Sequence, residues 1–306
     1  MRLLLATASQ AQAWRDAFAA ALPDARLHVW PDAPAEVDYA LVWKPPPECF
    51  ERVKVTRAIA NLGAGVDALL AVPTLPAGVP VLRLTDAGMA AQMAEYVTLA
   101  VLAAFREQRE YAQQQRERVW RPRRRLDKRA FGVGLLGMGV LGSAVAAALA
   151  PFGFPLRGWA RTPRDVPGVA MYAEAEGLHA LLAASNVLVC MLPSTPATRG
   201  LVGADVLRRL PRGAHVVNVS RGELVVETDL LAALDDGHLG SATLDVFAEE
   251  PLPAGHPFWH HPRIVITPHV SAATLIDDSV AQVAARIAAH ARGERVDGVV
   301  DRARGY

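Results

Sequence analysis

Short apolar runs alternate with longer amphipathic segments along most of the chain. The runs with the length and aliphatic content of buried strands are residues 2–6, 38–43, 57–62, 80–84, 131–137, 156–160, 186–192, 215–220, 241–247 and 263–268. Segments with the helical spacing of apolar residues lie at 11–21, 89–118, 144–150 and 228–234. This alternation is typical of parallel sheets joined by crossover helices, so we expect an α/β protein.

The alternation is interrupted once, and the interruption suggests a domain boundary. Residues 89–118 form a helical pattern without Pro or Gly, and the charged stretch RPRRRLDKR at residues 121–129 follows it. Strand-like runs then begin again. We therefore expect two doubly wound parallel-sheet domains, the smaller formed by residues 1–98 with 273–306 and the larger by residues 99–272.

The composition is that of a globular protein and narrows the set of partners. Hydrophobic residues make up 52% of the 306 residues, charged residues 21%, and the formal net charge is +1. No overall field therefore favours nucleic acid or an anionic membrane. Residues 121–129 could be read as a nucleic-acid patch. Because no aromatic residue interrupts this stretch, we interpret it as a solvated connector and expect no nucleic-acid partner.

The N-terminus and the cysteines bear on location. MRLLLATASQAQAW imitates a signal peptide, but its apolar run is shorter than a usual signal core, so we expect a first strand there. No stretch is long enough for a transmembrane helix, and we expect no membrane partner. Cys49 and Cys190 form no CxxC motif and are too few for a disulfide framework. We therefore expect a reducing, cytoplasmic location.

A glycine-rich turn follows the first strand of the larger domain. The segment FGVGLLGMGVLGSAVAAALA contains Gly137, Gly139 and Gly142 in the spacing GxGxxG, between an apolar strand and an Ala-rich helix. In this motif the first glycine permits the turn, the second lets the backbone approach a pyrophosphate, and the third allows close packing. The pyrophosphate would meet the helix N-terminus at Val140 and Leu141. The pattern predicts a Rossmann dinucleotide-binding domain; another nucleotide site or plain packing glycines are the alternatives.

The next strand ends without the acid that usually binds a ribose 2′-hydroxyl. Ala160 stands where that acid is expected, and Arg161, Thr162 and Arg164 follow. A guanidinium can bind the dianionic 2′-phosphate of NADP, which an acid would repel. We therefore expect NADP(H) to be preferred over NAD(H), with a surface loop rich in arginine as the alternative.

Three later segments carry residues suited to one reaction. Arg221, the carboxylates Asp245, Glu249 and Glu250, and His269 each follow an apolar strand. In open α/β sheets, ligands bind beyond the carboxyl ends of the strands, so these side chains could converge. Reduction of a 2-oxo acid requires a cation to bind the carboxylate and polarise the carbonyl, and a histidine to supply a proton. A carboxylate bonded to the other ring nitrogen would orient the imidazole. Taken singly, each residue is more often structural.

Together these motifs resemble the D-2-hydroxyacid dehydrogenase family, in particular its glyoxylate/hydroxypyruvate reductase branch. The segments that carry the resemblance are LVWKPP, NLGAGVD, the glycine turn, WARTPR, LLPSTPATRGL, NVSRGELV, LDVFAEEPLP, ITPHVSA and the terminal DRARGY. The resemblance covers nearly the whole chain. It implies a homodimer of two-domain subunits, with a flavodoxin-like smaller domain and the catalytic site in the cleft between the domains.

The resemblance also implies roles for individual residues. Arg221 corresponds to the substrate-binding catalytic arginine and His269 to the acid/base. The carboxylate partner of the histidine precedes Pro-Leu in the family, which selects Glu250 rather than Glu249.

Further positions correspond to binding residues. Asp245 resembles a residue that holds the nicotinamide carboxamide, and Pro193 one that lines the cofactor. The backbone of Ala64 and Gly65 would bind the substrate carboxylate, since glycine-rich turns form anion nests; a simple strand-to-helix turn is the alternative. Trp43 resembles an aromatic residue that closes the pocket, with a core tryptophan as the competing interpretation.

The segment GHPFWHHPR places three histidines together, at 256, 260 and 261. Their spacing fits no common metal site and the family needs no metal, so we expect none. The resulting hypothesis is an NADPH-dependent reductase of small 2-oxo acids, glyoxylate and hydroxypyruvate. A dehydrogenase of a larger D-2-hydroxy acid and a dinucleotide-sensing binding protein are the alternatives.

Overall fold

The computed structural model describes residues 1–306 and divides them into two compact units. Unit 1 comprises Met1–Met89 with Thr274–Tyr306, and unit 2 comprises Ala90–Ala273. Each unit contains one parallel sheet with helices on it.

Unit 1 is built on a five-stranded sheet in the order β2-β1-β3-β4-β5, and all its pairs are parallel. This is the flavodoxin-like doubly wound order, as expected. The strands are β1 (Arg2–Thr7), β2 (Arg26–Val29), β3 (Glu36–Trp43), β4 (Lys54–Asn61) and β5 (Val81–Arg83). The helices are α1 (Ala11–Ala21), α2 (Glu48–Arg52), α3 (Asp67–Leu70) and α10 (Ile276–Ala291).

The central strands of unit 1 are apolar because both of their faces are covered. Leu3, Leu4 and Leu5 follow one another on β1 and are all fully buried. Consecutive buried residues of this kind mark a parallel strand between two helical layers, since alternate side chains point to opposite faces. The RLLLAT segment is therefore a strand of the core, buried from Leu3 to Ala6.

Unit 2 is built on a seven-stranded parallel sheet in the order β12-β11-β10-β9-β6-β7-β8. Numbered from its own first strand, the order 3-2-1-4-5-6 is that of the Rossmann fold, with a seventh strand added. The strands are β6 (Val133–Leu136), β7 (Leu156–Trp159), β8 (Val169–Tyr172), β9 (Val187–Cys190), β10 (Ala214–Asn218), β11 (Leu239–Leu244) and β12 (Ile264–Ile266). Both sheets confirm the predicted fold class.

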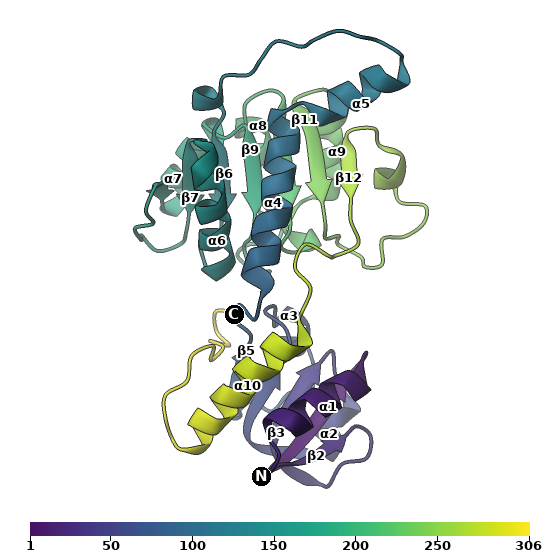
Figure 1. Ribbon diagram of the computed structural model, residues 1–306, viewed down its shortest axis with the longest axis vertical. Coiled ribbons are helices and arrows are strands. Elements are labelled where there is room, and N and C mark those ends of the chain that lie inside the picture. Colours follow the sequence, from purple (N-terminus) through teal and green to yellow (C-terminus); the bar gives the residue numbers. More distant parts are fainter. The chain divides into compact units, whose positions relative to one another are not determined.

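Helices cover both faces of this sheet. The α-helices are α4 (Met89–Phe105), α5 (Gln108–Arg116), α6 (Val140–Leu149), α7 (Glu174–Ala183), α8 (Ala204–Arg209) and α9 (Glu227–Asp235), and the 3-10 turns are η1 (Lys128–Ala130), η2 (Ala150–Phe152), η3 (Gly222–Leu224) and η4 (Pro257–His260). Val97 of α4 and Val145 of α6 pack with Val133 in one core cluster, and Figure 1 shows α4 running along the sheet. Leu181 of α7 and Leu230 of α9 belong to a second cluster.

The structure differs from the predicted elements at three places. The predicted helix over residues 89–118 is two helices, because the chain turns at Glu107, whose φ is 51°. A left-handed glutamate carries no sequence signal like that of Gly or Pro. The strands β2 and β8 were not predicted, since both are short edge strands whose side chains are only partly buried. Edge strands lack the continuous apolar pattern of central ones.

No helix combines the length and the apolar composition that a membrane crossing requires.

Candidate active site

The glycine turn after β6 has the geometry of a dinucleotide-binding turn. Gly137 has a φ of +104°, which strains other residues, and a Cβ there would lie 2.7 Å from the Met191 carbonyl oxygen. A Cβ on Gly142 would lie 2.0 Å from the Gly137 carbonyl oxygen. Helix α6 therefore packs against the turn at a distance that only glycine allows.

The start of α6 offers an open position for an anion. Gly139 is the N-cap residue and provides no side-chain cap, while a Cβ built on it would meet nothing within 4 Å. The amides of the first helical turn, which begins at Val140 and Leu141, point away from the helix at its positive end. Since no chain atom fills the space beside Gly139, the residues present fit a pyrophosphate.

The arginine loop after β7 lies next to this turn. Arg161, Thr162 and Arg164 are exposed, and the Arg164 guanidinium donates a hydrogen bond to the Met138 carbonyl oxygen inside the glycine motif. No carboxylate stands at the end of β7, where Ala160 lies half-buried. The loop thus brings positive charge to the edge of the glycine turn.

Pro193 lies in the loop that follows β9, the strand next to β6. Its carbonyl oxygen accepts a hydrogen bond of 2.6 Å from the Thr198 hydroxyl, and the same hydroxyl accepts one from the Thr195 amide at 2.9 Å. These bonds fix the loop after β9 at the carboxyl edge of the sheet.

Arg221 lies in the loop that follows β10. The Asn218 side chain donates to the Arg221 carbonyl oxygen at 2.9 Å, and the Arg221 guanidinium donates to the Ser220 carbonyl oxygen at 2.6 Å. A Cβ on Gly222 would lie 1.8 Å from the Phe247 carbonyl carbon. The absence of a side chain at Gly222 therefore allows the Arg221 loop to lie directly against the loop that follows β11.

The β11 loop carries the carboxylate that meets His269. Oε1 of Glu250 accepts the Phe247 amide at 3.1 Å, and Oε2 lies 2.8 Å from Nδ1 of His269. The His269 side chain is 47% exposed and that of Glu250 is 33% exposed. With Nδ1 held by Glu250, the imidazole can offer Nε2 to a ligand. Glu249 has no such bond to His269.

Asp245 is wholly buried, which the sequence did not predict. Its carboxylate accepts hydrogen bonds from the Thr267 hydroxyl at 2.6 Å, the Val270 amide at 2.9 Å and the Ser271 amide at 2.8 Å. Buried carboxylates require such donors because desolvation penalises their charge. Asp245 therefore anchors the loop on which His269 stands.

The predicted substrate loop of unit 1 follows β4. Asn61 donates from its side-chain amide to the carbonyl oxygens of Gly63 at 2.9 Å and Gly65 at 2.8 Å. The half-buried backbone amides of Ala64 and Gly65 donate to no group of the chain. A Cβ on Gly63 would lie 2.1 Å from the Trp43 ring, so the ring packs directly against this loop. The loop presents free amide donors beside an aromatic surface, which suits an anion.

The histidines after β11 do not gather around a common point. Nε2 of His256 lies 3.2 Å from Glu227, and Nε2 of His261 lies 3.3 Å from Asp235. No group of three or more His, Cys, Asp or Glu side chains has the arrangement of a metal site.

Three residues that shape these loops were not predicted from the sequence. Asn61 organises the unit 1 loop, while Thr267 and Tyr96 form hydrogen bonds behind Asp245. Thr267 could have been predicted, because it stands two residues before His269 in the same motif. Tyr96 could not, because its hydroxyl bonds to Thr267 across 171 positions of the chain.

Comparisons with known proteins agree with this architecture. The model of the D-isomer specific 2-hydroxyacid dehydrogenase NAD-binding domain matches residues 98–271. Glyoxylate/hydroxypyruvate reductase A of Yersinia enterocolitica is 44% identical over 303 residues, 97% of each chain. The protein of the same name from Serratia proteamaculans is 45% identical over 302 residues, 97% of this chain and 96% of that one.

Solved structures give the same result. A D-isomer specific 2-hydroxyacid dehydrogenase from Xanthobacter autotrophicus, in complex with NADPH, has a TM-score of 0.95 and 42% identity over 100% of this chain and 99% of that one. The NADPH-dependent glyoxylate/hydroxypyruvate reductase of Sinorhizobium meliloti, in complex with NADP, has a TM-score of 0.94 and 34% identity over the same shares. The resemblance predicted from the motifs is thereby confirmed. The chain belongs to the D-isomer specific 2-hydroxyacid dehydrogenase family of NAD(P)-dependent oxidoreductases.

Proposed function

We propose that this protein is an NADPH-dependent reductase of small 2-oxo acids that converts glyoxylate to glycolate and hydroxypyruvate to D-glycerate. The observation that carries the proposal is the Glu250–His269 pair, on loops at the same sheet edge as the glycine turn and Arg221. Relatives named for these two activities match the chain over 97% of its length.

In this proposal three side chains divide the work on the substrate. NADPH held by the glycine turn and the arginine loop would supply the hydride for the carbonyl carbon and would leave as NADP⁺. The Arg221 guanidinium binds the substrate and stabilises the negative charge that develops on the carbonyl oxygen. Nε2 of His269 donates a proton to that oxygen, and Glu250 holds Nδ1 so that the ring keeps its orientation. The products are the 2-hydroxy acid and a neutral imidazole, which regains its proton from solvent.

The remaining binding roles follow from the loop geometry. We assign the substrate carboxylate to the free amides of Ala64 and Gly65, and a wall of the substrate pocket to Trp43. Residues 1–98 with 273–306 would form the substrate domain and residues 99–272 the NADP domain. Pro193 would line the cofactor, and Asp245 would hold the nicotinamide end of the site through the His269 loop, whose Val270 and Ser271 amides it accepts.

We assign the cofactor preference to the arginine loop. Arg161, Thr162 and Arg164 are exposed beside the glycine turn, and no acid ends β7. Solved relatives with 42% and 34% identity were crystallised with NADPH and NADP. A guanidinium pair beside the ribose favours the 2′-phosphate, so NADP(H) is preferred over NAD(H).

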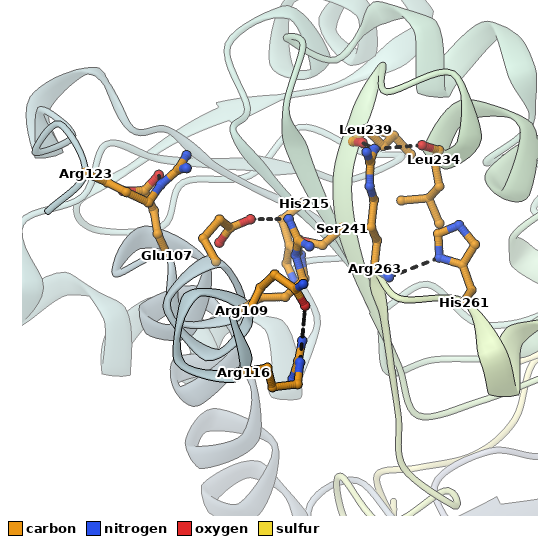
Figure 2. Close-up of polar contacts among 12 residues, drawn as sticks. Glu107, Arg109, Arg116, Arg123, His215, Leu234, Leu239, Ser241, His261 and Arg263 are labelled. Carbon is orange, nitrogen blue, oxygen red and sulfur yellow. Dashed lines mark hydrogen bonds and ion pairs between the residues drawn. The ribbon is translucent and has the colours of Figure 1, made fainter. Parts of the chain in front are cut away.

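We further propose a homodimer formed through the segment after α5. Trp120 is 100% exposed there, beside the exposed Val119. Tryptophan at full exposure is typical of a protein interface rather than of a free surface. Three residues further on, Arg123 forms a 2.7 Å ion pair with Glu107, which attaches the end of this segment to the turn between α4 and α5 of the same subunit (Figure 2).

We also propose a cytoplasmic location. The free, buried thiols of Cys49 and Cys190 suit a reducing cytoplasm.

The proposed activity is tested by following NADPH oxidation with a panel of 2-oxo acids: glyoxylate, hydroxypyruvate, pyruvate, a branched acid and an aromatic acid. We expect the two smallest polar substrates to have the highest kcat/KM, and NADPH to exceed NADH with each. A maximum for the aromatic or branched acid would favour a dehydrogenase of larger D-2-hydroxy acids. Tight NADPH binding without turnover of any substrate would favour a dinucleotide sensor.

A further inference from the structure

His269 is held in a backbone conformation that few side chains adopt. Its φ is 55°, in the left-handed region. A residue other than glycine stays in this region where surrounding contacts impose the conformation. In this protein those contacts come mainly from Asp245, and the Thr267 carbonyl oxygen also accepts the His269 amide at 3.1 Å.

Asp245 fixes three successive amides of the His269 loop. Its backbone carbonyl oxygen accepts the His269 amide at 2.8 Å. Its Oδ1 accepts the Val270 amide at 2.9 Å, and its Oδ2 accepts the Ser271 amide at 2.8 Å. Since Asp245 is fully buried, these bonds do not compete with water.

Two hydroxyl groups stand behind this carboxylate, and the direction of their hydrogen bonds is determined. The Thr267 hydroxyl donates to Oδ1 of Asp245 at 2.6 Å. Its single hydrogen is then used, so the Tyr96 hydroxyl, 2.5 Å away, must donate to Thr267. Burial raises the pKa of Tyr96, which keeps the hydrogen on its oxygen.

We propose that Tyr96 and Thr267 are positioning residues for the proton donor, an inference that rests on the proposed reductase function. The chain from Tyr96 through Thr267 to Asp245 links α4 to the loop after β12. These two hydrogen bonds hold the Asp245 carboxylate in the orientation in which it accepts the Val270 and Ser271 amides, which directly follow His269. The imidazole is thereby presented to Glu250, with Nε2 directed to substrate. The alternative is that the Tyr96–Thr267 hydrogen bond only attaches α4 to the sheet and contributes to stability alone.

The test compares Thr267→Val and Tyr96→Phe with wild type. Thr267→Val removes the donor to Asp245 and leaves Tyr96 without its acceptor. We expect kcat to fall by about 10- to 100-fold, because a small displacement of a catalytic group costs this much. Tyr96→Phe leaves the Thr267 donor in place and should cause a smaller loss. KM and the Kd of NADPH should stay near wild type, and the solvent isotope effect on kcat should increase as proton donation becomes slower.

Two controls separate positioning from general stability. Thr267→Ser keeps the hydroxyl and should recover most of kcat. Tyr111→Phe removes a tyrosine hydroxyl that accepts the Arg123 amide elsewhere in unit 2, and should leave kcat and the isotope effect unchanged. A Thr267→Val protein with a lowered Tm but wild-type kcat and isotope effect would establish the tether and overturn the proposal.

A readout that needs no turnover keeps this inference distinct from the proposed function. In protein labelled with ¹³C-histidine, the Cε1–H signal of His269 can be assigned by its loss in His269→Ala. We expect it to shift and broaden in Thr267→Val and to return in Thr267→Ser. If wild type reduced no 2-oxo acid, the proposed function would fail while this signal still reported on the ring. An unchanged signal in Thr267→Val would refute the positioning role.

Discussion

Nδ1 of His269 lies 2.8 Å from Oε2 of Glu250, although the neighbouring Glu249 carries the same side chain. The difference comes from the loop after β11, where the Phe247 amide holds the other oxygen of Glu250. A carboxylate bound at one oxygen presents the second in a fixed direction, so Glu250 rather than Glu249 orients the imidazole.

Glu250→Gln should lower kcat by about 100-fold, because proton donation by an oriented imidazole contributes at least this factor. Glu249→Gln is the matched control, with the same change of charge one residue away, and should retain wild-type kcat. Initial rates with glyoxylate and NADPH measure both. Equal losses in the two variants would mean that the local charge, not the bond to His269, sets the rate.

Arg161→Asp should reverse much of the cofactor preference. A hydrogen bond to a charged group contributes about 1.5–3 kcal/mol, so the ratio of kcat/KM for NADPH over NADH should fall by roughly 10-fold or more. NADH turnover itself should be spared. The exposed Arg209 lies on α8, and Arg209→Asp gives the same change of charge. The assignment of Arg161 is wrong if both variants keep the wild-type ratio.

Two glycines of the same motif should respond differently to alanine. Gly139→Ala adds a Cβ into space that the chain leaves open, so Tm should hold while the Kd of NADPH rises sharply. Gly142→Ala adds a Cβ 2.0 Å from the Gly137 carbonyl oxygen and should destabilise unit 2 by about 1–3 kcal/mol, as overpacking does. Thermal unfolding and titration of NADPH fluorescence separate the two effects. If Gly139→Ala still bound NADPH tightly, the assignment of the pyrophosphate to the space beside Gly139 would be wrong.

His215 should make stability depend on pH below neutrality. It lies on β10, and its ring is hydrogen-bonded to two side chains of β11, Ser241 at 2.8 Å (Figure 2) and Thr243 at 3.0 Å. Burial, helped by the Arg109 charge, lowers its pKa from 6.5 to about 4. The unfolded chain therefore binds the extra proton first, and stability is lost as pH falls from about 6.5 towards 4.

Between pH 7.5 and 4.5, His215 should account for roughly 2–3 kcal/mol of the lost free energy of unfolding. His215→Gln should lose less stability than wild type over this interval, whatever its stability at pH 7.5. His179→Gln, at an exposed position on α7, serves as the control and should follow wild type. Urea unfolding at the two pH values measures the differences, and parallel curves for all three proteins would exclude a role for His215.

Trp120→Ser should weaken the proposed dimer. Removing a fully exposed tryptophan from a free surface has little effect, whereas an interface tryptophan commonly contributes 2 kcal/mol or more, about a 30-fold change in Kd. Light scattering after gel filtration over a range of concentrations gives the oligomeric state. Phe152→Ser changes another exposed aromatic residue, on η2, and should leave the mass unchanged. A monomeric wild type would dismiss the proposal outright.

The sequence by itself determined the architecture and the residue types of the candidate site. Strand-like runs such as those at 2–6 and 215–220 are buried on both faces, and a parallel strand between helical layers carries its signal locally. The glycine turn was readable because each glycine answers a local steric demand. The resemblance to the family, in which the carboxylate partner precedes Pro-Leu, pointed to Glu250 rather than Glu249, and Glu250 is the one that lies beside His269.

Only the tertiary structure decided the features that depend on contacts between distant residues. The left-handed Glu107 that divides α4 from α5 has no Gly or Pro signal. The burial of Asp245, and the hydroxyl chain from Tyr96 through Thr267 behind it, join residues that lie far apart in the sequence. Periodicity reports which face of an element is apolar, but the partner of a buried polar group depends on which elements pack together. The sequence therefore named His269 as a candidate residue, and the fold decided which groups bond to its loop.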